Sequence, residues 1–186
     1  MPALATWAPE DGVLGAIAPL ALAIAQPNSP AALVVDLDPR GPKYPSARSL
    51  RDLVVDGPRS TDLAPAGAGV AVMANGGVPF AEARELLNLL LGNWPAIVLR
   101  LPPQAPDDVP APTVPVRLLT PGRLFSPQGR GVYQPIGGTI NRDKVHPGSL
   151  LLPPAPRRTI AALLDGERPR PGRWLSAWAQ VWGMAW

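Results

Sequence analysis

Two aspartates stand two residues apart, directly after an apolar run, in a spacing at which paired carboxylates can do chemistry. Asp36 and Asp38 follow residues 31–35, whose continuous apolar side chains predict a buried parallel strand. Because side chains two residues apart on an extended chain point to the same face, we expect the two carboxylates to lie together. Such a pair can hold a divalent metal or orient an attacking water. The structural alternative is a turn that Pro39 and Gly41 set and that Asp36 caps.

The loop after the first predicted strand, at residues 4–8, is the next place where a ligand could bind. A phosphate-binding loop needs glycines, a lysine and a hydroxyl, and this loop supplies only Gly12 and Gly15. Glu10 and Asp11 add negative charge where a triphosphate would bring more, and like charges in a poorly solvated loop repel by several kcal/mol. The sequence therefore predicts that this loop does not bind ATP.

The end of the fourth predicted strand, at residues 96–99, carries a cation instead of a metal ligand. Arg100 stands where a P-loop enzyme places a magnesium-coordinating aspartate, and arginine stays protonated and cannot bind a metal. The chain has no cysteine and one histidine, His146, which excludes disulfides, thiolate zinc sites, thiol nucleophiles and histidine-rich metal sites. We therefore expect no metal, no cofactor and no catalytic residue.

Strands and helices alternate along the chain in the manner of an α/β protein. Strands are predicted at residues 4–8, 31–35, 69–74, 96–99, 114–119, 131–134 and 149–152, and helices at 13–25, 49–54, 79–91, 159–164 and 174–186. Pro19 fits the first helix only in or near its first turn. This order predicts an open, mostly parallel sheet flanked by helices, in a single domain of 186 residues. Such sheets place ligands at the carboxyl ends of their strands.

Composition and charge narrow the class of protein further. Apolar residues make up 46% of the chain and charged residues 17%, which is typical of a globular protein, and 27 prolines with 18 glycines predict long, rigid loops. Between Arg117 and Arg173 there are ten basic and three acidic residues, a net charge of +7 that leaves −4 on the rest of the +3 chain. This C-terminal third suits an anionic partner (nucleic acid, lipid headgroups or an acidic protein), or is a solvated arginine surface.

No segment of the sequence has the length of a membrane span. The longest apolar stretch, residues 12–25, has 14 residues against the roughly 20 that a transmembrane helix needs. Acidic residues precede it where a signal peptide carries basic ones, so we expect a cytoplasmic protein.

Several segments, in this order, resemble motifs of the MinD/ParA branch of the P-loop NTPases. The most specific is LVVDLDPRG at residues 33–41, which resembles the family's apolar strand followed by D-x-D-P-x-G. Weaker matches are an L-x-D-L helix at 49–53, a G-L-x-V-L-P-A-G strand at 69–75, a Y-D-x-V-I-I-D-x-P-P strand at 94–103, and a closing region at 150–158 with 165–166. The chain is most similar to the CpaE/TadZ-type members, which localise bacterial tight-adherence pilus machinery. Residues 1–120 carry the best match, whereas the Pro/Gly/Arg-rich residues 121–173 and the C-terminal helix at 174–186 match weakly.

The chain departs from this family at the residues that handle phosphate. The family's Walker A motif, K-G-G-x-G-K-T, falls near residues 11–17, where Asp11 and Ala16 replace its lysines and Ile17 replaces its threonine. Arg100 replaces the Walker B aspartate, so three parts of phosphoryl-transfer chemistry are missing. Asp36 and Asp38 are retained, but their family roles need magnesium and a nucleotide. The resemblance therefore implies a degenerate P-loop NTPase fold without hydrolysis, a pseudo-ATPase.

A localisation or assembly scaffold is the function that this resemblance implies. Its partner would be an active ATPase of the family, a pilus or secretion complex, or a second copy, since the family dimerises face to face across the nucleotide site. In such a dimer Arg100 could pair with the acidic loop of Glu10 and Asp11. The alternatives are a nucleic-acid-binding adaptor that uses the basic C-terminal third and a residual enzyme with a metal on Asp36 and Asp38.

Four tryptophans at a spacing of four residues close the chain. Trp174, Trp178, Trp182 and Trp186 would share one slowly drifting face of the predicted C-terminal helix. Three interpretations follow: the stripe packs on its own sheet, anchors a protein interface, or contacts a membrane peripherally. The face opposite the stripe carries no lysine or arginine to engage lipid.

Overall fold

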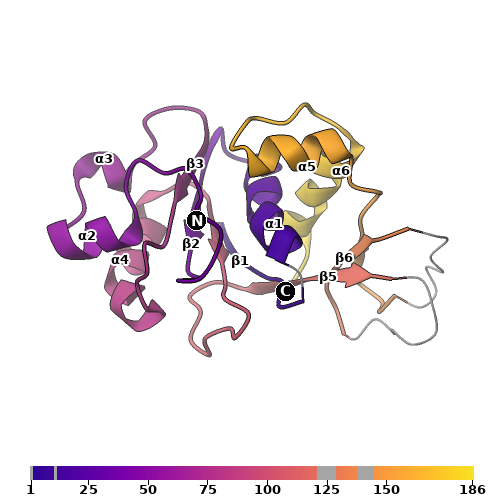
Figure 1. Ribbon diagram of the computed structural model, residues 1–186, viewed down its shortest axis with the longest axis horizontal. Coiled ribbons are helices and arrows are strands. Elements are labelled where there is room, and N and C mark those ends of the chain that lie inside the picture. Colours follow the sequence, from indigo (N-terminus) through magenta and orange to yellow (C-terminus); the bar gives the residue numbers. More distant parts are fainter. Residues whose placement is uncertain (1, 11, 121–128, 138–144) are drawn as a thin grey trace.

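The strands form one parallel sheet in the order β3-β2-β4-β1-β5-β6-β7 (Figure 1). The computed structural model describes residues 2–10, 12–120, 129–137 and 145–186, so Asp11 lies outside the described residues. The strands of this part are β1 (Ala3–Trp7), β2 (Ala31–Asp36), β3 (Gly69–Met73), β4 (Ile97–Arg100), β5 (Thr113–Leu119), β6 (Val132–Pro135) and β7 (Leu150–Leu151). Every neighbouring pair runs parallel, which confirms the predicted open α/β sheet.

Helices flank both faces of this sheet. They are α1 (Gly12–Ile24), α2 (Leu50–Asp56), α3 (Ser60–Leu63), α4 (Phe80–Asn93), α5 (Arg157–Leu164) and α6 (Arg173–Trp178), followed by a 3-10 helix at Ala179–Gly183. In Figure 1, α5 and α6 lie beside α1, whereas α2, α3 and α4 gather at the opposite end of the molecule. The short helix α3 was not predicted. None of the helices in the described ranges has the length and apolar character to cross a membrane.

Two hydrophobic cores result, one on each face. Helices α1, α5 and α6 pack with Val34 and Val98 in the first core, and α2 and α4 pack with Val35 and Leu99 in the second. Successive side chains of one strand point to opposite faces, which is why Val34 and Val35 belong to different cores. Strands that are buried on both faces read as unbroken apolar runs, the pattern that predicted β2 and β4.

Helix α1 contains Pro19 in its interior, so the expectation that this proline needs the first turn is wrong. A proline has no N–H to donate to the carbonyl four residues earlier, which is that of Gly15. Tertiary contacts compensate: Nε of Arg100 donates to the Gly15 carbonyl oxygen at 3.0 Å, and the Tyr44 hydroxyl donates to the next carbonyl oxygen, Ala16 O, at 2.6 Å. The interruption in the helix thereby provides an acceptor for Arg100.

Candidate functional site

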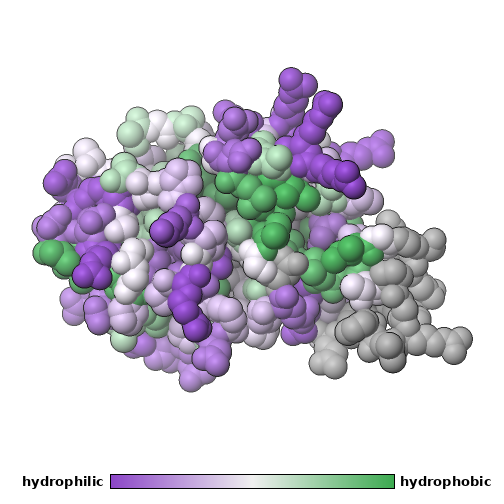
Figure 2. Space-filling model, viewed as in Figure 1, coloured by the Kyte–Doolittle hydropathy of each residue, from purple (hydrophilic) through white to green (hydrophobic). Residues whose placement is uncertain are grey.

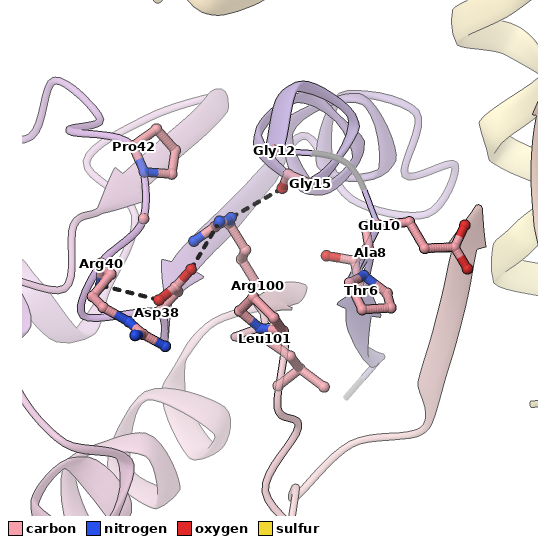
Figure 3. A pocket seen from close by; sticks show the side chains of 13 residues that line it. Thr6, Ala8, Glu10, Gly12, Gly15, Asp38, Arg40, Pro42, Arg100 and Leu101 are labelled. Carbon is pink, nitrogen blue, oxygen red and sulfur yellow. Dashed lines mark hydrogen bonds and ion pairs between the residues drawn. The ribbon is translucent and has the colours of Figure 1, made fainter. Parts of the chain in front are cut away.

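The candidate site is a cleft of about 370 Å³ at the carboxyl ends of β1, β2 and β4, which are neighbours in the sheet. The loop after β1, the first turn of α1, the turn after β2 and the end of β4 line it (Figure 3). Parallel α/β sheets place their ligands at these carboxyl ends of the strands. Because β4 lies between β1 and β2, Arg100 is in register with Asp36 on one side and with Thr6 on the other.

Arg100 forms a buried ion cluster with both aspartates after β2. Its Nη1 lies 2.8 Å from Oδ1 of Asp36, and its Nη2 lies 3.1 Å from Oδ2 of Asp38. Arg100 is 6% exposed, Asp36 1% and Asp38 5%. Figure 3 shows the guanidinium between Asp38 and the Gly15 carbonyl, below the first turns of α1. All three guanidinium nitrogens therefore have acceptors inside the chain.

Burial and pairing have opposite effects on these charges. Burial raises the pKa of the Asp36 carboxyl, and the Arg100 guanidinium and the Asp38 N–H lower it by less. Burial lowers the pKa of the Arg100 guanidinium, but Asp36, Tyr44 and Asp38 raise it by more, so Arg100 keeps its charge. Burial also raises the pKa of the Tyr44 phenol, which therefore stays protonated and donates to Ala16.

The turn after β2 is built by the same two aspartates. Oδ1 of Asp36 accepts the Asp38 N–H at 3.0 Å, Oδ1 of Asp38 accepts the Arg40 N–H at 3.0 Å, and the Gly41 N–H donates to the Asp38 carbonyl at 3.0 Å. A Cβ at Gly41 would overlap Nη1 of Arg100, so the close approach of the turn to the guanidinium requires glycine there. These contacts match the turn that the sequence offered as the structural alternative for Asp36 and Asp38.

A metal has little to bind at this site. The carboxylates of Asp36 and Asp38 that a cation would use already face the guanidinium. Within the residues that the structure describes, no group of three or more His, Asp or Glu side chains is arranged to hold a metal ion. The hydroxyl of Thr6 on the cleft wall donates to the Leu99 carbonyl at 3.3 Å.

The first turns of α1 carry the residues that the resemblance aligns with the Walker A motif. Gly12 begins the helix, and Gly15 offers its carbonyl to the guanidinium. Ala16 and Ile17, which the resemblance aligns with the second lysine and the threonine of that motif, are 4% and 2% exposed. Ile17 belongs to the core under α1. These positions therefore serve packing and offer no side-chain group to phosphate.

The expected pairing of Arg100 with the acidic loop of a second copy needs correction. Arg100 is buried and has its carboxylate partners in its own chain. Glu10 pairs with Arg117 instead, with Oε1 of Glu10 3.1 Å from Nη1 of Arg117. Sequence reasoning missed this outcome because it compared charges without the strand order, which brings β4 between β1 and β2.

The predicted C-terminal helix is divided, and its tryptophans bind their own chain. The α-helix ends at Trp178, so Trp182 and Trp186 leave the common face. Trp174 and Trp178 are 1% and 0% exposed, with ring centroids 5.7 Å apart in an edge-to-face pair, and Nε1 of Trp174 donates to Gln134 Oε1 at 2.6 Å. Trp182 donates to the backbone of α1, and Trp186 lies under the Arg130 guanidinium. The interface and membrane interpretations need an exposed stripe, which Trp174 and Trp178 do not provide.

The basic C-terminal third presents arginines to solvent. Arg130 is exposed, and five further exposed arginines lie on α5, at the start of α6 and on the loop between them: Arg157, Arg158, Arg168, Arg170 and Arg173. None of these five side chains makes an ion pair with another described residue. Figure 2 shows long hydrophilic side chains projecting from this part of the molecule. Arg123, Arg142 and Lys144 lie outside the described ranges.

Two features of the site were not predicted from the sequence: Tyr44, and the close approach of Gly41 to Arg100. Tyr44 lies between prolines in a loop, where a single aromatic residue gives no periodic signal. Gly41 looks like an ordinary turn glycine until the guanidinium beside it is known. No protein-family model, curated protein or solved structure matches this chain.

Proposed function

We propose that this chain is a non-catalytic relative of the MinD/ParA ATPases, a pseudo-ATPase that acts as a localisation or assembly scaffold through protein contacts. The observation that supports this most is the Arg100 guanidinium bound to both Asp36 and Asp38. In the family that the sequence resembles, these aspartates work with magnesium and a nucleotide. Here an internal cation is paired with both of them.

The residues present do not fit a magnesium-bound nucleotide. The guanidinium stands at the carboxyl end of β4 and contacts both the turn after β2 and the first turn of α1. Its removal from a buried ion pair costs about 3–5 kcal/mol, which an entering ligand would have to offset. Among the described residues that line the cleft there is no lysine, and Glu10 on its rim repels phosphate.

A scaffold of this kind assembles without regard to nucleotide. Its partner would be an active ATPase of the family, a pilus or secretion complex, or a second copy of the chain. The test measures phosphate release from ATP by this chain alone, and the mass of this chain with and without magnesium and ATP. We expect no release above background and the same mass in both conditions. Turnover that depends on magnesium, or a mass that follows nucleotide, would refute the proposal.

A second candidate function, a nucleic-acid-binding adaptor, is supported by the five exposed arginines around α5 and α6 that lack acidic partners. If they contact phosphates, the logarithm of the affinity for duplex DNA falls linearly with the logarithm of salt, by about 0.9 for each phosphate neutralised. Arg168→Ala with Arg170→Ala should then lower this slope by about 2. Arg84→Ala, at an exposed arginine paired with Asp108 on the opposite part of the molecule, is the control. Absence of binding at low salt would remove this candidate.

A further inference from the structure

Strand β3 forms one edge of the sheet, and in the described residues no strand pairs with its outer side. The Gly69 N–H points toward β2, because it donates to the Pro30 carbonyl at 2.7 Å. In a parallel pair, alternate residues direct both their N–H and their C=O to the same neighbour. Val70 and Val72 therefore direct theirs away from β2, so that the edge offers two donors and two acceptors.

The chain limits this edge at both ends. The next outward carbonyl, that of Ala74, already accepts the Leu50 N–H at 2.8 Å, and Ser49 forms an isolated parallel bridge with Ala74. At the other end Gly69 has φ of +121°, which turns the chain away from the strand direction. A partner strand can therefore bind only the short segment around Val70 and Val72.

Nothing in the sequence of β3 discourages pairing. Its residues, GVAVM, include no charge and no proline, the devices with which proteins usually protect an edge strand. The side chains of Val70 and Val72 are half-buried and line a groove of about 560 Å³ that runs between β3, α1 and the end of α5, with both apolar and polar residues in its walls. The backbone edge and this groove are continuous.

We propose that β3 pairs with β3 of a second copy, antiparallel, about a two-fold axis at Ala71. Val70 then lies opposite Val72 of the second copy, and each such pair of residues exchanges two backbone hydrogen bonds. Because the two-fold axis generates both pairs, all four outward groups on each edge find a partner. The facing valines extend the apolar side of the sheet across the interface, and β-branched pairs of this kind stabilise antiparallel strands.

The charges beside the edge also fit a second copy. Glu167 and Arg168 line the same groove, both are exposed, and neither side chain has an ion-pair partner in the described part of the chain. A patch with one charge of each sign is complementary to its own copy across a two-fold axis. Strand β3 itself carries no charged residue, so two β3 edges can meet without repulsion between like charges. This dimer does not use the Arg100 cleft, and it holds whether or not the proposed function does.

Light scattering on the full chain over a micromolar concentration series tests the proposal. We expect the mass to rise from 19.5 kDa toward twice that value. Val72→Pro removes one outward N–H donor from β3 in each copy, and edge strands tolerate proline at such an outward position. The dimer then loses two hydrogen bonds, which should weaken dimerisation about 30-fold. Val70→Lys, which places a charge at the apolar contact, should do the same. Val55→Lys is the matched control, because Val55 is 73% exposed on α2, away from the edge.

Two results would overturn the proposal. One is a wild-type mass of 19.5 kDa at every concentration. The other is a dimer that survives Val70→Lys, since a dimer formed across the Arg100 cleft would be insensitive to the β3 edge. Circular dichroism checks that each variant is folded, and Val70→Lys decides the matter if Val72→Pro does not fold.

Discussion

Replacement of Arg100 by alanine tests the ion cluster on which the account of the cleft depends. The change leaves Asp36 and Asp38, which are 1% and 5% exposed, facing each other without a cation. Loss of one partner from a buried ion pair costs about 3–5 kcal/mol. The Gly15 carbonyl also loses its donor, because Pro19 has no N–H to offer it. For a chain of this length, in which 1 kcal/mol shifts the melting temperature by about 2–4 °C, we expect it to fall by about 6–20 °C.

Arg84→Ala provides the matched control. Arg84 forms an ion pair with Asp108 at a similar distance, 3.0 Å, but both side chains are more than half exposed. Exposed pairs contribute about 0–1 kcal/mol, so this variant should melt within a few degrees of the wild type. Urea unfolding, followed by circular dichroism, gives the free energies of unfolding of both variants. If Arg100→Ala costs no more than Arg84→Ala, the ion cluster does not stabilise the fold and the reasoning fails.

The Arg100→Ala variant should also acquire an affinity for magnesium. Without the guanidinium, the carboxylates of Asp36 and Asp38 face an open cleft and can bind a hard cation. Millimolar magnesium should then raise the melting temperature of Arg100→Ala and leave that of the wild type unchanged. An equal response of the two proteins would show that the guanidinium does not stand in for a metal.

Three further predictions follow from single contacts. Gly41→Ala should lower the free energy of unfolding in urea by about 1–3 kcal/mol, because the new Cβ overlaps the Arg100 guanidinium. Gly92→Ala, in open space on α4, should raise it by about 0.5–1 kcal/mol. Equal effects of the two substitutions would contradict this prediction. Gln134→Leu should cost about 1–3 kcal/mol, because it leaves the buried Trp174 N–H without an acceptor; an unchanged free energy of unfolding would count against that bond. Hydrogen bonds from the N-cap serine of α2 lower the pKa of Asp52, so its contribution to stability is present above pH 3.8 and is lost as the pH falls below it. The melting temperatures of wild type and Asp52→Ala should therefore converge in acid, and a constant difference would refute the assignment.

Most of the fold could be predicted because its signals are local. The strand that ends at Asp36 reads as an unbroken apolar run, since both of its faces are buried. The period of two residues also placed the carboxylates of Asp36 and Asp38 on one side, where both contact Arg100. Pro39 and Gly41 predicted the tight turn after β2, which the hydrogen bond from the Gly41 N–H to the Asp38 carbonyl closes.

The ion cluster could not be predicted because it depends on strand order. Asp36 and Arg100 are 64 residues apart and meet only because β4 lies beside β2. Pro19 was misjudged for the same reason: the donor that satisfies the Gly15 carbonyl comes from β4 and not from the helix. The end of the C-terminal α-helix at Trp178 was not predicted either. Tryptophans four residues apart share one face only if the α-helix continues, and their spacing does not show where the helix ends.

Calorimetric titration of the wild-type chain with ATP and magnesium tests the central claim most directly. Because the Arg100 guanidinium holds Asp36 and Asp38 and contacts α1, we predict no heat of binding up to millimolar ATP, with or without magnesium. A saturable, magnesium-dependent isotherm with a dissociation constant in the micromolar range would show that the cleft still binds nucleotide, and would contradict the account.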